Sequence, residues 1–194
     1  MKNVMWILLA FVLSAAFLAR AEDQQPAKAK DLVVYYSYTG NTELVGKTLA
    51  EALKANTLKI EDVKVPTRDE AYGAGKEAAQ QGKAWPIKPF NTDFSAYERI
   101  FVGCPVWFNM PTPQFNAFVD QVNFAGKQVV VFVTLGGGNP DKALKTMTEK
   151  IEAKGGKVVS SFSVKTRNVS KEELATKARE IAKQYQEQPK TAVE

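Results

Sequence analysis

The chain has 194 residues, of which 45% are hydrophobic and 24% charged, a composition typical of a globular protein with one domain. Its formal charge of +5 is small and scattered along the chain, so we expect no nucleic-acid partner. The sequence contains no histidine, which excludes Ser-His and Cys-His catalysis as well as histidine-based metal sites.

The N-terminus has the parts of a secretory signal peptide. Met1-Lys2-Asn3 is a short positive start, Val4–Leu18 is apolar apart from one serine, and Ala19-Arg20-Ala21 offers a cleavage site. We expect residues 1–21 to be removed, leaving a polar linker over residues 22–30 and a periplasmic or secreted protein without stable membrane insertion. The alternative is an uncleaved membrane anchor, although a span needs about 20 apolar residues and this run is shorter.

The first predicted strand, Val33–Tyr36, breaks into a loop of hydroxyl and glycine residues before the predicted helix Glu43–Ala55. The first amides of a helix lack partners, and the helix dipole favours an anion there. Because the loop contains no Lys or Arg, hydroxyls and amides would hold the anion, which suits a terminal monophosphate. The alternative is that these residues only form a turn and a helix cap. The residues expected to surround the phosphate are Ser37, Tyr38, Thr39, Gly40, Asn41 and Thr42.

This loop resembles that of the flavodoxin-like family, in which T/S-x-T-G-x-T after the first strand binds the phosphate of FMN. The chain has Ser37-x-Thr39-Gly40-x-Thr42, and the resemblance extends from about Asp31 to Tyr185. It implies FMN as the cofactor. Gly46 departs from the pattern, because the family usually has alanine there, and a glycine within a helix costs up to about 1 kcal/mol.

The next predicted strand, Leu58–Val63, is more polar and is expected near a sheet edge. Pro66–Pro89 has the least regular pattern, and we expect a loose helix over Arg68–Gln81 and a long loop. Connections of this length are often functional. Tyr72 and Trp85 could border a ligand, although ordinary packing is the favoured interpretation.

The strand Arg99–Cys104 leads into a second segment that resembles the family. Its single cysteine is expected to be a buried, inert thiol. Family members show G-x-P-x-W followed by an aromatic and a small residue, and their aromatic side chain flanks the flavin. The resemblance makes Trp107 the first choice for stacking and Phe108 the second, the alternative being Trp107 as a core residue. Asn109 replaces a frequent glycine, but asparagine tolerates a left-handed backbone. The cofactor-binding residues implied here are Pro105, Val106, Trp107, Phe108 and Asn109.

After an amphipathic helix over residues 115–122, the apolar strand Gln128–Val133 ends in a third such segment, Thr134–Pro140. Three successive glycines permit close backbone approach to a flavin edge, and a floppy connector is the alternative. The residues expected at that edge are Thr134, Gly136, Gly137 and Gly138. A helix follows, then the strand Lys157–Val164 and a helix that opens with the capping box Ser170-x-x-Glu173. Residues 188–194 are a polar tail.

Five strands that alternate with helices predict an α/β fold over residues 31–187, a doubly wound, five-stranded parallel sheet of flavodoxin-like order 2-1-3-4-5. The three loops would then meet at the carboxyl edge of the sheet. The resemblance implies an exported FMN protein that exchanges electrons with a redox partner protein or a small quinone. We predict no catalytic and no metal-binding residue, because the flavin would supply the chemistry. The alternatives are an NAD(P)H-dependent quinone or flavin reductase, and a binding protein without flavin.

Overall fold

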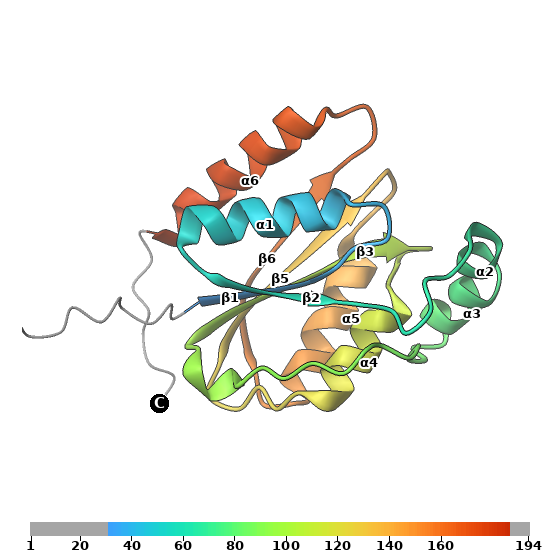
Figure 1. The fold of residues 1–194 in the computed structure, drawn as a ribbon, viewed down its shortest axis with the longest axis horizontal. Helices are drawn as coiled ribbons and strands as arrows, with labels where there is room; N and C mark the ends of the chain where they lie inside the picture. Colours follow the sequence, from blue (N-terminus) through green and yellow to red (C-terminus); the bar gives the residue numbers. More distant parts are fainter. Residues whose placement is uncertain (1–30, 187–194) are drawn as a thin grey trace, which may run out of the picture.

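The computed structural model describes residues 31–186; the predicted signal peptide, the linker and the polar tail lie outside them. A parallel sheet with the strand order β2-β1-β3-β5-β6 runs through the centre (Figure 1). This order confirms the prediction, because β4 is an additional two-residue strand that pairs antiparallel with the end of β3. The strands are β1 (Asp31–Tyr36), β2 (Asn56–Ile60), β3 (Arg99–Trp107), β4 (Met110–Pro111), β5 (Gln128–Leu135) and β6 (Lys157–Lys165).

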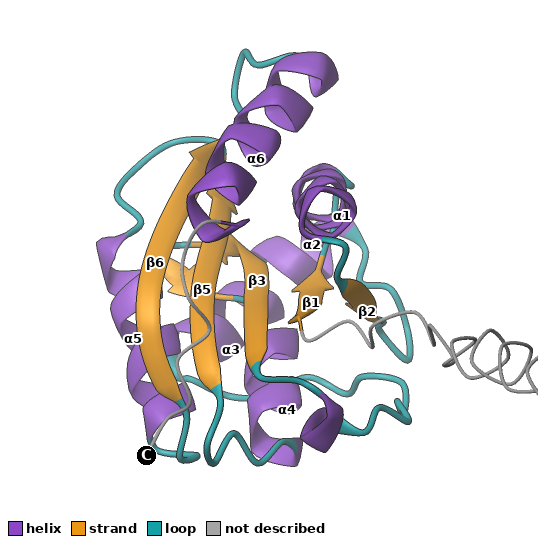
Figure 2. Cartoon of the chain, turned by 90° about the vertical axis from the view of Figure 1, so that its left-hand side faces the viewer, coloured by secondary structure: helices purple, strands orange, loops and turns teal. Residues whose placement is uncertain are grey.

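Helices cover both faces of the sheet. One face lies under α1 (Asn41–Leu53) and α6 (Lys171–Gln186), the other against α4 (Pro113–Gln121) and α5 (Asp141–Glu152) (Figures 1 and 2). Because side chains alternate along a strand, Val33 and Tyr35 of β1 pack toward α1 and α6. Their neighbours Leu32, Val34 and Tyr36 pack on the opposite side. The central strands are therefore buried on both faces, as a parallel sheet requires.

The segment between β2 and β3 forms two short helices where the sequence suggested one loose helix. These are α2 (Arg68–Tyr72) and α3 (Ala74–Gln80), which form a lobe beyond the carboxyl ends of the strands, hereafter the α2–α3 lobe (Figure 1). A capping box opens α2, because Thr67 and Glu70 each bond to the other's backbone amide. The chain then returns past β2, where Asp62 pairs with Ile87, and reaches the 3₁₀ helix η1 (Phe94–Ala96).

Gly46 of α1 is explained by the side chain below it. A Cβ atom added at Gly46 would lie 2.6 Å from Cδ1 of Tyr35, whose ring is fully packed in the core. The space that alanine would need is therefore occupied by an aromatic ring of β1. Within residues 31–186, no helix is long and apolar enough to cross a membrane.

Candidate functional site

The loop after β1 leaves the start of α1 open. Gly40, the residue before the helix, has a left-handed backbone with φ of 89°, and its amide donates to Oγ of Ser37 over 3.1 Å. Of the described side chains, none caps the helix. The first amides of α1 therefore point toward Thr39 and Gly40, which are exposed, at the positive end of the helix dipole.

The end of β3 turns back on itself as a hairpin. Trp107 pairs with Met110 of β4, and the two residues between them, Phe108 and Asn109, have φ of 51° and 66°. Two-residue hairpin turns favour positive φ, and asparagine adopts it readily. The tolerance predicted for Asn109 is confirmed. A bulky residue at positive φ is rare, so the hairpin holds Phe108 in a strained conformation.

The loop after β5 is bonded to the first loop through two buried hydroxyls. Oγ1 of Thr134 lies 2.7 Å from Oγ1 of Thr42, and these residues are 3% and 1% exposed. The pair holds two protons and uses one in this bond, so one remains to donate elsewhere. The hydroxyl of Thr42 thus has a partner within the protein, and its predicted contact with a phosphate stays a prediction. Further along, Gly138 lies beside Asn109, whose Oδ1 would be 3.6 Å from an added Cβ.

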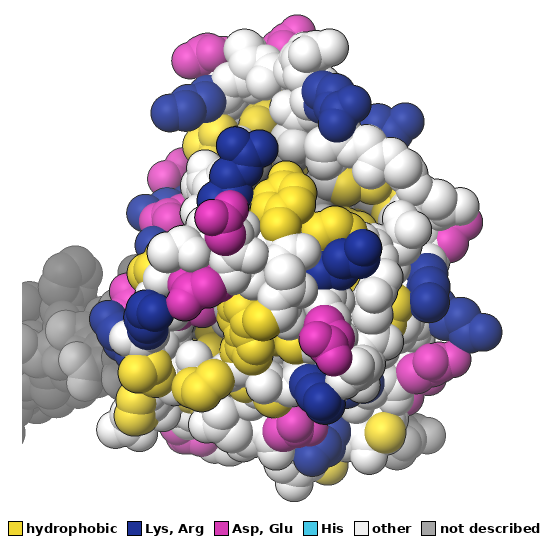
Figure 3. Space-filling model, turned by 90° about the vertical axis from the view of Figure 1, so that its right-hand side faces the viewer, with side chains coloured by type: hydrophobic (Ala, Val, Ile, Leu, Met, Phe, Trp, Pro, Cys, Tyr) yellow, Lys and Arg dark blue, Asp and Glu magenta, His cyan; other side chains and the backbone are white. Residues whose placement is uncertain are grey.

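These loops surround a cavity of about 380 Å³ at the carboxyl edge of the sheet, within the size range of ligand sites (Figure 3 views the molecule from this side). The predicted site residues that line it are Tyr38, Thr39, Asn41, Pro105, Val106, Trp107, Phe108, Thr134 and Gly136. The others shape or adjoin the same loops without lining the cavity, namely Ser37, Gly40, Thr42, Asn109, Gly137 and Gly138. Further lining comes from Ala71, Tyr72, Leu135 and Thr166.

Aromatic rings form the wall between the sheet and the α2–α3 lobe. The ring of Trp107 meets Tyr38 and Trp85 edge-on, with centroids 5.5 and 6.3 Å apart. Gly75 of α3 lies against both tryptophans, because an added Cβ would be 2.9 Å from Trp107 and 3.0 Å from Trp85. The packing role favoured for Trp85 is therefore confirmed. Trp107 therefore packs against these aromatic rings and also lines the cavity.

The position of Tyr72 differs from the packing role favoured by the sequence. Packing was favoured, but the residue is 61% exposed and lines the cavity, touching Phe108 edge-on at 5.7 Å. No local pattern marks this role, because it depends on where the lobe docks. Thr166 was also missed, although it follows β6, and the rule that ligands bind beyond the carboxyl ends of parallel strands points to it.

The titratable groups near the site fit binding better than proton transfer. Cys104 is buried as predicted, and burial raises the pKa of its thiol to about 12, which disfavours the reactive thiolate. Hydrogen bonds from Lys47 and Lys59 lower the pKa of Glu43, the acidic residue in the first turn of α1. These lysines offset its charge where an anion would bind. Over residues 31–186, no cluster of three or more His, Cys, Asp or Glu could hold a metal ion.

The sheet order and a ligand-sized cavity at the carboxyl edge define a doubly wound α/β protein of the flavodoxin type. The flavodoxin family model matches residues 30–176, and the chain belongs to this family.

Two curated relatives carry the name NAD(P)H dehydrogenase (quinone). The one from Cupriavidus metallidurans is 28% identical over 138 residues, 70% of this chain and 64% of that protein. The one from Azorhizobium caulinodans is 31% identical over 93 residues, 48% of this chain and 46% of that protein. The aligned part thus spans less than two thirds of either relative.

Solved structures share the fold. A protein of Bacteroides uniformis superposes with a TM-score of 0.67 at 24% identity, covering 82% of this chain and 99% of that one. A flavoprotein from Lactobacillus acidophilus, solved in complex with FMN, superposes with a TM-score of 0.62 at 22% identity. That match covers 70% of this chain and 93% of the other. At these identities the likeness concerns the fold alone.

Proposed function

We propose that this protein binds FMN in the 380 Å³ cavity and transfers electrons through the bound flavin. The observation that carries the proposal is the meeting of the loops after β1, β3 and β5 around one cavity. An uncapped helix start lies on one side of it and aromatic rings on the other. Membership of the flavodoxin family and the FMN in a protein of the same fold support it.

The residues fit the cofactor group by group. The open amides of α1, with Thr39 and Asn41, would hold the phosphate; Trp107 and Phe108 would lie against the flavin ring. When Thr42 donates to Thr134, the hydroxyl proton of Thr134, which lines the cavity, is left to donate to a polar group of the ligand. FMN, when bound, supplies one- and two-electron transfer, so the protein's residues need only bind it, orient it and limit the access of water.

The visible absorption spectrum of the purified protein, before and after adding FMN, tests this proposal. A yellow protein, or a colourless one that takes up FMN stoichiometrically, is the expected result. A protein that stays colourless after FMN addition would refute it and favour a binding protein on the same fold.

A second candidate is an NAD(P)H-dependent quinone reductase, because both curated relatives carry that name. Such an enzyme needs room for a second planar molecule beside the flavin, and the exposed Tyr72 leaves one wall of the cavity open to solvent. Steady oxidation of NADPH or NADH with a quinone as acceptor would establish the enzyme. Reduction and reoxidation only by a partner protein would establish a carrier.

We also propose that the protein is exported, on the basis of the apolar run Val4–Leu18 and the cleavage site Ala19-Arg20-Ala21. N-terminal sequencing of the protein from a cell-envelope fraction should then begin at Glu22. A cytoplasmic protein that retains Met1 would contradict export, and recovery with the membrane would favour the uncleaved anchor.

A further inference from the structure

The cavity carries positive charge on the side of the α2–α3 lobe. The Nζ atom of Lys76 lies 5.3 Å from the centroid of the Phe108 ring, and Cζ of Arg68 lies 5.6 Å from that of Tyr72. Both rings line the cavity. A planar molecule that lies against either ring is therefore close to a cation.

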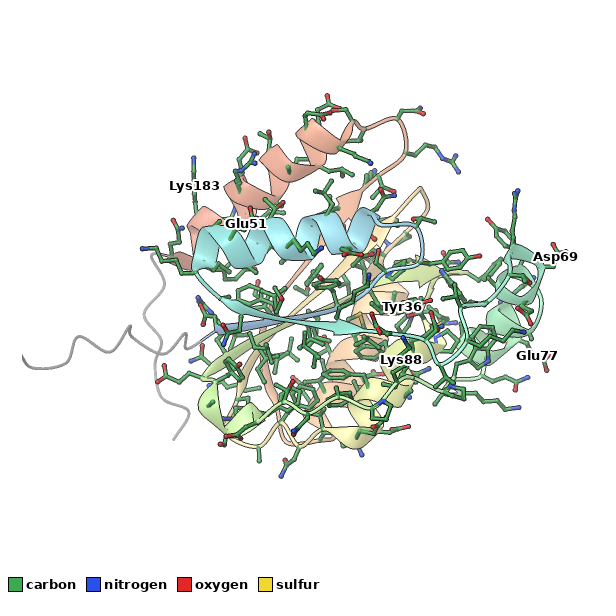
Figure 4. The ribbon with its side chains drawn as sticks, viewed as in Figure 1. Tyr36, Glu51, Asp69, Glu77, Lys88 and Lys183 are labelled. Carbon is green, nitrogen blue, oxygen red and sulfur yellow. The ribbon has the colours of Figure 1, made fainter. Side chains whose placement is uncertain are left out.

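Neither cation has a carboxylate partner within the part of the chain that the structure describes. The ion pairs there use other basic residues, such as Lys64, which pairs with Glu70 of the lobe. Two further acids of the lobe, Asp69 and Glu77, lie at its outer end and point away from the sheet (Figure 4). Neither cation beside the rings is therefore held in an ion pair by a carboxylate of the lobe.

A third cation lies next to the cavity lining, on the loop after β6. Arg167 follows Thr166, which lines the cavity, and its guanidinium would be 3.9 Å from a Cβ added at Gly137. Like Arg68 and Lys76, it is exposed. Cations thus lie on the lobe and, adjoining the lining residue Thr166, on the loop after β6.

We propose that Arg68 and Lys76 make the mouth of this cavity selective for planar aromatic molecules that carry an anionic group, such as an arylsulfonate or an aryl carboxylate. With FMN in place, the exposed ring of Tyr72 beside Phe108 would contact the aromatic part, and the cations would attract the anion. Since neither cation must first leave an ion pair and both are exposed, little existing interaction is lost on binding. The inference rests on the proposed function only for the role of such molecules as electron acceptors; their binding is a separate property.

The test compares naphthalene-2-sulfonate with naphthalene-2-sulfonamide, which has nearly the same shape and is neutral at pH 7. Isothermal titration of the full-length, FMN-loaded protein at low salt should show tighter binding of the sulfonate. In Arg68→Gln and Lys76→Gln the preference should fall about fivefold each, and in the double variant about twentyfold, as expected for exposed charge pairs. The preference should also shrink as salt rises from about 20 to 500 mM.

Two controls separate charge from structure. Lys183→Gln makes the same change in charge on α6, at the opposite end of the molecule from the lobe (Figure 4), and should keep the wild-type preference. The double variant Arg68→Lys with Lys76→Arg retains both positive charges and should retain the wild-type preference for the sulfonate. Equal binding of the two probes, no binding of the sulfonate, or a preference unchanged in the double glutamine variant would overturn the inference. A failure of the proposed function is seen separately, as absence of FMN uptake in the spectrum.

Discussion

The loops at the edge of the sheet and the α2–α3 lobe form opposite sides of one cavity, but they are built differently. The loops are tied to the core by buried contacts such as the Thr42–Thr134 bond. The lobe consists of two short helices whose contacts at the cavity are exposed or half-buried rings. Fixed loops suit a cofactor that stays bound, whereas an exposed lobe suits a molecule that comes and goes.

A glycine-to-alanine substitution in each region tests this difference. The substitution in α1 has the largest expected effect on stability. At Gly46 an alanine meets the packed ring of Tyr35 at 2.6 Å, so Gly46→Ala should destabilise the protein by about 2 kcal/mol despite the better helix propensity of alanine. At Gly75 the two nearest atoms belong to the side chains of Trp107 and Trp85, which are only half-buried and can shift, and the third is the backbone carbonyl of Glu70 at 3.3 Å. Gly75→Ala should change stability by less than about 1 kcal/mol.

Urea unfolding followed by circular dichroism measures both variants against the wild type. Tryptophan fluorescence should respond to Gly75→Ala and much less to Gly46→Ala. Equal losses of stability would show that the lobe is packed as tightly as the core.

The two threonines of the first loop should separate structure from ligand binding. Thr42→Val removes a buried hydroxyl bond and leaves Thr134 without its partner, so the apoprotein should lose about 1–2 kcal/mol. Thr39 is exposed and lines the cavity, so Thr39→Ala should leave the apoprotein intact and weaken FMN about tenfold or more. Unfolding curves of the apoproteins measure the effect on stability, and FMN titrations measure the effect on binding. Full stability in Thr42→Val would mean that the hydroxyl pair contributes nothing.

Lowering the pH should destabilise α2 before the sheet. This is the smallest of the expected effects. Hydrogen bonds from the Thr67 amide, from Lys64 and from the Thr67 hydroxyl lower the pKa of Glu70 to about 2, below its usual 4.5. A lowered folded-state pKa stabilises α2 above pH 4.5, and this contribution is lost as the pH falls toward 2. The protection factors of the α2 amides, which correct the observed exchange for the intrinsic rate at each pH, should therefore fall between pH 5 and about 3, while those of β3 stay high.

Glu70→Gln should show the lower protection factors in α2 already at pH 6, and these should not change with pH in this range. The control is Glu173→Gln, which breaks the equivalent capping box of α6 and should leave α2 unchanged. Protection factors in α2 that do not change with pH in the wild type would contradict the prediction.

The same contrast explains how far the sequence could be used for prediction. The sheet, its order and the three loops follow from apolar runs, helix periodicity and the rule that ligands bind at carboxyl ends. The Thr67-x-x-Glu70 capping box was visible in the sequence and would have placed the start of α2.

The cationic mouth could not have been predicted in this way. The direction of Tyr72 and the cations above the rings depend on how α3 docks against Trp107 through Gly75, a contact between residues far apart in the chain. The bond of Thr42 to Thr134 likewise joins two loops that only the folded sheet brings together.

The uncapped start of α1 is proposed to hold the phosphate of FMN, and this is tested by comparing FMN with riboflavin, which lacks only that phosphate. Titration of the apoprotein, followed by quenching of flavin or tryptophan fluorescence, should show FMN binding at least about tenfold more tightly, because each hydrogen bond to a charged group contributes about 1.5–3 kcal/mol. Thr39→Ala should narrow this difference. Equal affinities for FMN and riboflavin in the wild type would contradict the account.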